Sequence, residues 1–271
     1  MDNRAIGVFD SGLGGLTAVK ELKKLLPCEK IVFFGDTARL PYGIHDRETI
    51  CKYAQDDIRF LLSKDVKIII AACGTVSSNF PKEDAENLPV PFIDIISPTV
   101  EAAVRLSKNG TVGVLGTEAT ISSGAFEREI HRLAPDITVV SKACPLFVPL
   151  VENGYGDPDD PFILHVAEEY LLGIREAGCD TVILGCTHYP HLSRVIQKIL
   201  GPDVTLINSG METASAASYL LHEKGLETSG TEGCVSYYVT ENPENFNERA
   251  SFFLGEEITQ QLLKVDLVLQ K

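Results

Sequence analysis

The sequence predicts an α/β protein with two pseudo-symmetric, doubly wound lobes, mainly parallel sheets and an active site in the cleft between the lobes. Three observations lead to this prediction. Short runs of β-branched residues alternate with longer helical patterns, which is typical of parallel sheets flanked by helices. Three motifs recur in the same order in both halves of the chain. The third motif of each half contains a cysteine closely followed by threonine.

The expected strands are short apolar runs, and the expected helices between them carry apolar residues at three- and four-residue spacing. In chain order the strands cover residues 5–9, 30–34, 66–71, 90–95, 111–115, 137–140, 181–184 and 204–207. The helices cover residues 15–26, 46–63, 97–106, 121–133, 163–177, 189–200 and 213–222. Each half therefore follows the order strand, helix, strand, helix, strand.

The internal repeat predicts the domain organisation. The paired segments are IGVFDSG with VGVLGTE, IVFFGD with ITVVSKAC, and IIIAACGT with TVILGCTH. The first two pairs have the same displacement along the chain, and the third has a slightly longer one. We expect a discontinuous first lobe of residues 1–97 plus 208–271, and a second lobe of residues 98–207.

The composition excludes several classes of function. The chain of 271 residues has a formal net charge of -14 and no basic stripe, so nucleic acid is not an expected partner. The N-terminus lacks the pattern of a signal peptide, and the apolar runs are too short to cross a membrane. We therefore expect a cytoplasmic protein without a membrane partner. Its seven cysteines form no C-x-x-C pair and are expected to be free thiols.

Two cysteines stand where a thiol can do chemistry. Cys73 and Cys186 each follow a predicted strand, and ligands of open α/β sheets bind outside the carboxyl ends of the strands. Inversion of an α-carbon needs a base on one face and an acid on the other. A thiol has a pKa near 8.5, so it can serve in either state. One such cysteine is commonly only a packing residue, but matching positions in two half-repeats favour a catalytic pair.

Other candidate residues lie in loops that should face the same cleft. Asp10 and Ser11 belong to the DSGLGG turn, where Asp10 could instead be a structural helix cap. His188 stands two positions after Cys186 and could relay protons to it, and Glu152 could polarise this histidine. A metal set of Cys186, His188 and His191 is disfavoured because zinc needs a further ligand from a recognisable motif.

These residues lie in five motifs that together resemble a known family. The segments DSGLGGLTAVKEL, FFGDTARLPYG, AACGTVSS, CPLFVPLVENG and LGCTHYPHL resemble the glutamate racemases of the aspartate/glutamate racemase superfamily. The resemblance implies interconversion of L- and D-glutamate without pyridoxal phosphate, any other cofactor or a metal. It also implies a cytoplasmic enzyme that supplies D-glutamate for peptidoglycan synthesis, and a homodimer.

The resemblance also assigns roles to residues. It implies that Cys73 and Cys186 are the acid/base pair, with Asp10 near the first thiol and Glu152 and His188 near the second. The substrate contacts that it implies, with Thr117 added from the matching loop of the second half, are Asp10, Ser11, Tyr42, Gly43, Gly74, Thr75, Thr117, Thr187 and His188. The family usually has asparagine where this chain has Gly74, so the contact there is expected to differ. Control by a nucleotide precursor through an N-terminal extension is not expected.

Three other functions remain open at this point. A sister racemase would use the same thiols on aspartate, which a panel of substrates would reveal. A ligand-binding module of two α/β lobes would bind without exchange of the α-proton. A dithiol redox protein would form a reversible disulfide between Cys73 and Cys186, which a substrate lying between them argues against.

Overall fold

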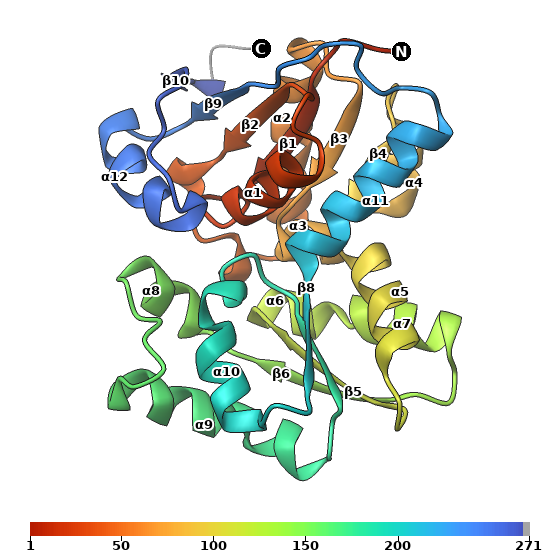
Figure 1. Cartoon of the computed structure of the whole chain (residues 1–271), viewed down its shortest axis with the longest axis vertical. Coiled ribbons are helices and arrows are strands. Elements are labelled where there is room, and N and C mark those ends of the chain that lie inside the picture. Colours follow the sequence, from red (N-terminus) through yellow and green to blue (C-terminus); the bar gives the residue numbers. More distant parts are fainter. Residues whose placement is uncertain (268–271) are drawn as a thin grey trace.

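The computed structural model describes residues 1–267 and confirms the α/β fold with two parallel sheets, one in each of two stacked lobes (Figure 1). Every strand pairing in the described residues is parallel. The first sheet has the order β10 (Leu262–Lys264), β9 (Val235–Val239), β2 (Ile31–Gly35), β1 (Ile6–Asp10), β3 (Ile68–Ala71) and β4 (Phe92–Asp94). The second sheet has the order β6 (Thr138–Ala143), β5 (Thr111–Gly116), β7 (Thr181–Leu184) and β8 (Thr205–Asn208).

Helices cover both sheets, as parallel strands require crossover connections. The helices of the first lobe are α1 (Leu16–Leu25), α2 (Arg47–Ser63), α3 (Gly74–Asn79) and α4 (Lys82–Glu86). Those that pack on the second sheet are α5 (Ile96–Leu106), α6 (Glu118–Ser123), α7 (Ala125–Leu133), α8 (Phe147–Glu152), α9 (Pro161–Glu176) and α10 (Ser193–Leu200). The last two are α11 (Ser209–Glu223) and α12 (Pro243–Leu254). In the described residues, no helix has the length and apolar character needed to cross a membrane.

The chain returns to the first sheet after the second lobe. Strand β8 leads into α11, which packs against α1 beside the first sheet. Strand β9 then pairs with β2 along the full register from Ile31 opposite Val235 to Gly35 opposite Val239. These contacts support the proposed division into lobes of residues 1–97 plus 208–271 and of residues 98–207. Neither β9, β10 nor α12 was expected from the sequence patterns.

Two expected helices differ from the structure. The continuous helix over residues 121–133 is wrong, because Gly124 adopts φ 63° and separates α6 from α7. This left-handed conformation has little cost for glycine and ends the first helix. The helix over residues 189–200 begins as a 3-10 turn, Tyr189–Leu192, before α10.

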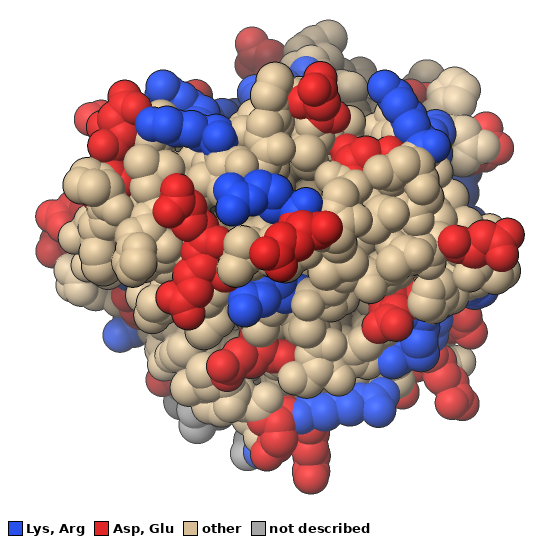
Figure 2. Space-filling view, turned by 90° about the horizontal axis from the view of Figure 1, so that it is seen from below, with Lys and Arg blue, Asp and Glu red and all other residues tan. Residues whose placement is uncertain are grey.

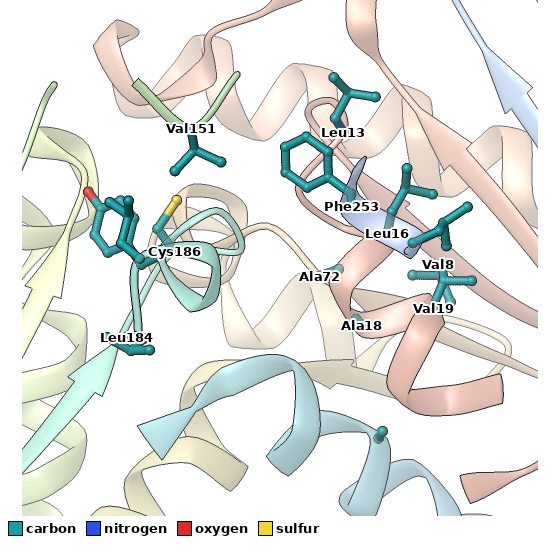
Figure 3. Packing of buried hydrophobic residues seen from close by; sticks show 14 of the residues in the cluster. Val8, Leu13, Leu16, Ala18, Val19, Ala72, Val151, Leu184, Cys186 and Phe253 are labelled. Carbon is teal, nitrogen blue, oxygen red and sulfur yellow. The ribbon is translucent and has the colours of Figure 1, made fainter. Parts of the chain in front are cut away.

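One hydrophobic cluster runs through both lobes. It joins Val8, Leu16 and Ala72 of the first lobe to Val151 and Leu184 of the second (Figure 3). The face of the molecule in Figure 2 shows acidic and basic side chains interspersed among neutral ones. Apolar packing therefore continues from one lobe into the other and helps to hold the two sheets together.

A buried ion pair lies in the first lobe at the amino ends of the strands, just before β2 and β3. Lys67 is 1% exposed, and its Nζ lies 2.6 Å from Glu29 Oε2. The same Nζ donates to the carbonyls of Asp2 at 2.9 Å and Leu226 at 2.8 Å. The backbone N–H of Thr228 donates to the other oxygen of Glu29 at 2.8 Å. This pair therefore links the start of the chain, the first sheet and the segment after α11.

Candidate active site

The first half of the site lies at the carboxyl ends of β1 and β3. These strands are neighbours, and Phe9 is opposite Ala71, so Asp10 and Cys73 leave the sheet side by side. The Cys73 thiol donates to Ser11 Oγ at 3.5 Å. One oxygen of the Asp10 carboxylate accepts from the N–H of Gly12 at 2.9 Å, whereas Oδ1 is buried and has no hydrogen-bond partner among residues 1–267. A ligand that donates a hydrogen bond would satisfy this second oxygen.

Burial keeps the first thiol protonated near neutral pH. Burial, together with the nearby charge of Asp10, raises the pKa of Cys73 to about 12. Burial also raises the pKa of Asp10, and the positive charge of His188 opposes this shift. The charge of Cys186 contributes to the raised pKa of Cys73, so the two sulfurs are within electrostatic range of each other. At neutral pH, Cys73 is therefore an acid, able to donate a proton.

The second half of the site follows β7. The sheet pairing continues one residue beyond β7, because the N–H of Gly185 donates to the carbonyl of Leu115 at 2.8 Å. Cys186 is the next residue. In Figure 3 the sulfur of Cys186 points away from Leu184 and towards the side on which Val151 lies. His188 Nδ1 lies 3.9 Å from this sulfur, and His188 Nε2 lies 2.9 Å from Glu152 Oε1.

These three side chains form a relay of charge in which Cys186 and His188 are buried and Glu152 is half-buried. Burial lowers the pKa of His188, but the hydrogen bonds and charges of Cys186 and Glu152 outweigh it and raise the pKa to about 10. Burial raises the pKa of Glu152, whereas the hydrogen bond and charge of His188 lower it to a net value below the ordinary one. His188 is therefore an imidazolium at neutral pH, and it holds a positive charge beside Cys186.

Other predicted residues join the lobes around the two thiols. Thr75 Oγ1 and Thr117 Oγ1 are 3.1 Å apart and belong to different lobes. Thr187 is buried, and its carbonyl accepts from the hydroxyl of Thr17 at 3.2 Å. A Cβ atom on Gly43 would lie 3.0 Å from Thr117, so this loop also contacts the second lobe. The predicted loops thus converge on one region.

The side chain of Tyr42 has a different environment. It is buried, and its hydroxyl donates to Asp36 and contacts Asp57 Oδ2 at 3.1 Å. Arg39 also bonds to both of these carboxylates. The Tyr42 side chain therefore fixes the loop, and only its backbone is available for the substrate contact that the sequence predicts.

Comparison with known proteins decides the family. The family model of the Asp/Glu/Hydantoin racemases matches residues 17–217. The chain belongs to this family. A curated glutamate racemase of Geobacter metallireducens is 42% identical over 257 residues, 94% of each chain. A glutamate racemase of Streptococcus thermophilus is 41% identical over 272 residues, covering 100% of this chain and 99% of the relative.

Solved structures agree with this membership of the racemase family. The glutamate racemase of Francisella tularensis in complex with D-glutamate has a TM-score of 0.92 and 41% identity, over 98% of this chain and 99% of that one. The glutamate racemase of Thermus thermophilus in complex with β-chloro-D-alanine has a TM-score of 0.88 and 41% identity, over 99% of both chains. The expected amino-acid racemase, an isomerase, is therefore confirmed.

Helix α12 brings residues to this racemase site that the sequence patterns did not indicate. The ring centroids of Phe253 and His188 are 5.3 Å apart in an edge-on arrangement, and the charge of Arg249 helps to lower the pKa of Glu152. His191 stacks on Phe252 at 4.7 Å, and burial lowers its pKa to about 4, so it is neutral at pH 7. From the sequence, Phe252 and Phe253 could be expected to be buried. No local pattern indicates that they contact histidines of the other lobe.

Replacing Glu152 with glutamine is expected to lower the pKa of His188, because the change removes the carboxylate bonded to Nε2. The pKa of about 10 lies above the ordinary 6.5, so His188 stabilises the fold below pH 6.5 and this contribution is lost as the pH rises through 10. In the variant the loss should still begin near pH 6.5 but be complete about one pH unit lower or more. NMR titration of the histidine rings measures this change.

The exposed pair of His222 and Glu227, 3.3 Å apart, provides a matched control. The variant Glu227→Gln removes the same type of carboxylate far from the site and should leave the pKa of His188 unchanged. If His188 still titrated at about 10 in the Glu152→Gln protein, the relay of charge would be wrong.

Proposed function

We propose that this racemase interconverts L-glutamate and D-glutamate by acid/base catalysis with two thiols and no cofactor or metal. The observation that carries the proposal is the pair of buried cysteines at the strand ends of opposite lobes, each with its own charged neighbour, Asp10 for Cys73 and His188 for Cys186. Identities of 41–43% to curated glutamate racemases support the choice of substrate.

In the direction from L to D, Cys186 removes the α-proton and Cys73 delivers a proton to the opposite face. The reverse reaction exchanges these roles. The His188 imidazolium attracts the negative charge of a deprotonated Cys186, and Glu152 holds the ring in place. The raised pKa of Cys73 suits the acid in this direction.

The substrate must be held by both of its charged ends. The unpaired Asp10 Oδ1 is the proposed acceptor for the ammonium group. Backbone N–H groups of Gly74 and Thr75 are the proposed donors to the α-carboxylate, where charge develops as the proton leaves. The remaining contacts are assigned to Ser11, Tyr42, Gly43, Thr117, Thr187 and His188.

The wider role follows from the product. D-glutamate is a component of peptidoglycan, so we propose that the enzyme supplies this amino acid for cell-wall synthesis in the cytoplasm. We also propose that it acts as a homodimer.

Incubation of L-glutamate with the pure, chelator-treated enzyme in D2O tests the proposal. Proton NMR should show loss of the α-proton signal, and a chiral assay should show D-glutamate. Exchange without inversion would contradict the two-thiol mechanism. Absence of exchange on glutamate together with exchange on aspartate would reassign the substrate, and absence of both would indicate a binding protein.

A further inference from the structure

The two lobes touch at Gly74 more closely than any side chain would allow. Gly74 begins α3, directly after Cys73. A Cβ atom at this position would lie 2.2 Å from the carbonyl oxygen of Gly185 in the second lobe and 3.4 Å from Ile95. The obstacle is backbone rather than the end of a flexible side chain, so it cannot move aside without a shift of one lobe.

A second glycine of the first lobe meets the same segment. A Cβ atom on Gly14 would lie 2.0 Å from Thr187 Oγ1 and 2.6 Å from His188 Nδ1. Gly14 belongs to the loop after β1, and Gly74 is the first residue of α3, which follows β3. Both glycines therefore contact residues 185–188, the segment that carries Cys186.

The partner of Gly74 is itself fixed in place. A Cβ atom on Gly185 would lie 2.7 Å from the carbonyl oxygen of Leu115, so Gly185 cannot carry a side chain without a shift of the backbone beside the second sheet. The contact with Gly74 thus joins two backbones directly, and the position of the Cys186 loop is set by the bare surfaces of Gly14 and Gly74.

We propose that Gly14 and Gly74 form a glycine seat, which positions the Cys186 loop and sets how closely the two thiols approach. In addition to the substrate contact proposed for its backbone N–H, Gly74 is then a positioning residue, because it has no side chain that would hold the lobes apart. An asparagine at position 74, which the resemblance leads one to expect, would hold the lobes further apart in this chain. In the seated arrangement Cys73 is 5% exposed and Cys186 is 7% exposed, so separation of the lobes is needed to admit reagents.

The rate of thiol alkylation reports how accessible Cys73 and Cys186 are, and this measurement does not depend on turnover. Wild type and the variants Gly74→Ala and Gly74→Asn are treated with iodoacetamide, and each cysteine peptide is quantified by mass spectrometry. Overpacking of this contact should raise the alkylation rates of Cys73 and Cys186 about tenfold or more. The exposed Cys234 is an internal reference whose rate should not change.

Two controls separate movement of the lobes from general loosening. Cys179 is 5% exposed, like Cys73, but lies before β7 at the other end of that strand, so its rate should stay at the wild-type value. The variant Gly173→Ala adds a methyl group in α9, where a Cβ atom meets no atom of the described part of the chain within 4 Å, and should react like wild type at every cysteine. Equal acceleration of Cys73, Cys186 and Cys179, or unchanged rates at both site cysteines, would overturn the proposal.

The consequence for turnover rests on the proposed function. If the enzyme racemises glutamate, Gly74→Ala should lower kcat more than it raises KM, because the thiols are displaced after substrate has bound. Wild-type protein without activity on glutamate would reject the proposed substrate and leave the alkylation result intact. Unchanged kcat in a Gly74→Ala protein with faster alkylation would overturn the claim that the seat sets the working separation of the thiols.

Discussion

Replacing Cys73 or Cys186 with serine is expected to reduce racemisation of glutamate about 10²–10⁴-fold, the usual contribution of a positioned acid or base. A serine hydroxyl has nearly the same size but is a far weaker acid than a thiol, so the geometry persists and the proton transfer fails. The rate of D-glutamate formation from L-glutamate, followed by a chiral assay, measures the loss.

The two single variants should also differ from each other. In the Cys73→Ser protein, Cys186 can still remove the α-proton of L-glutamate and return a solvent-derived one to the same face. We expect residual deuterium exchange into L-glutamate for Cys73→Ser and into D-glutamate for Cys186→Ser. The variant Cys234→Ser, at an exposed position, serves as a control and should retain wild-type turnover. Near-normal racemisation by either site variant would contradict the two-thiol mechanism.

Replacing Glu29 with glutamine is expected to lower the free energy of unfolding by about 3–5 kcal/mol, because it leaves the charge of Lys67 buried without a counter-ion. The ion pair is inaccessible on both sides and the ammonium also holds two backbone carbonyls. Urea denaturation followed by circular dichroism measures the change.

An exposed ion pair gives the matched comparison. Lys24 Nζ lies 2.7 Å from Glu21 Oε1 on the surface of α1, and such pairs contribute at most about 1 kcal/mol. Glu21→Gln should therefore have little effect on unfolding. A Glu29→Gln protein as stable as Glu21→Gln would show that Lys67 finds other compensation in the fold.

The sequence was informative wherever the physical cause is local. A strand of apolar residues that ends at a polar or small residue predicts which positions leave a parallel sheet at its carboxyl edge, and this rule places Cys73 and Cys186. The same argument applies to Asp10 at the end of β1, where the structure has a buried carboxylate beside the first thiol.

Features that depend on distant parts of the chain could not be predicted in this way. Strand β9 pairs with β2 across some two hundred residues, and no local pattern names its partner. Phe253 approaches His188 only because α12 packs near the other lobe. The LPYG loop has the composition of a substrate-binding turn. In the structure, however, the hydroxyl of Tyr42 bonds to the carboxylates of Asp36 and Asp57 instead.

The late return of the chain to the first sheet has a consequence for folding on the ribosome. Strands β5 to β8 emerge in one uninterrupted stretch, so the second lobe can complete its sheet while translation continues. The first lobe must wait, because the outer side of β2 stays open until Val235–Val239 has been synthesised. During that interval Ile31–Gly35 is an exposed apolar edge, the kind of template on which nascent chains aggregate. The whole interval between the synthesis of β2 and that of β9 is therefore the period in which this edge is open to pairing with other chains.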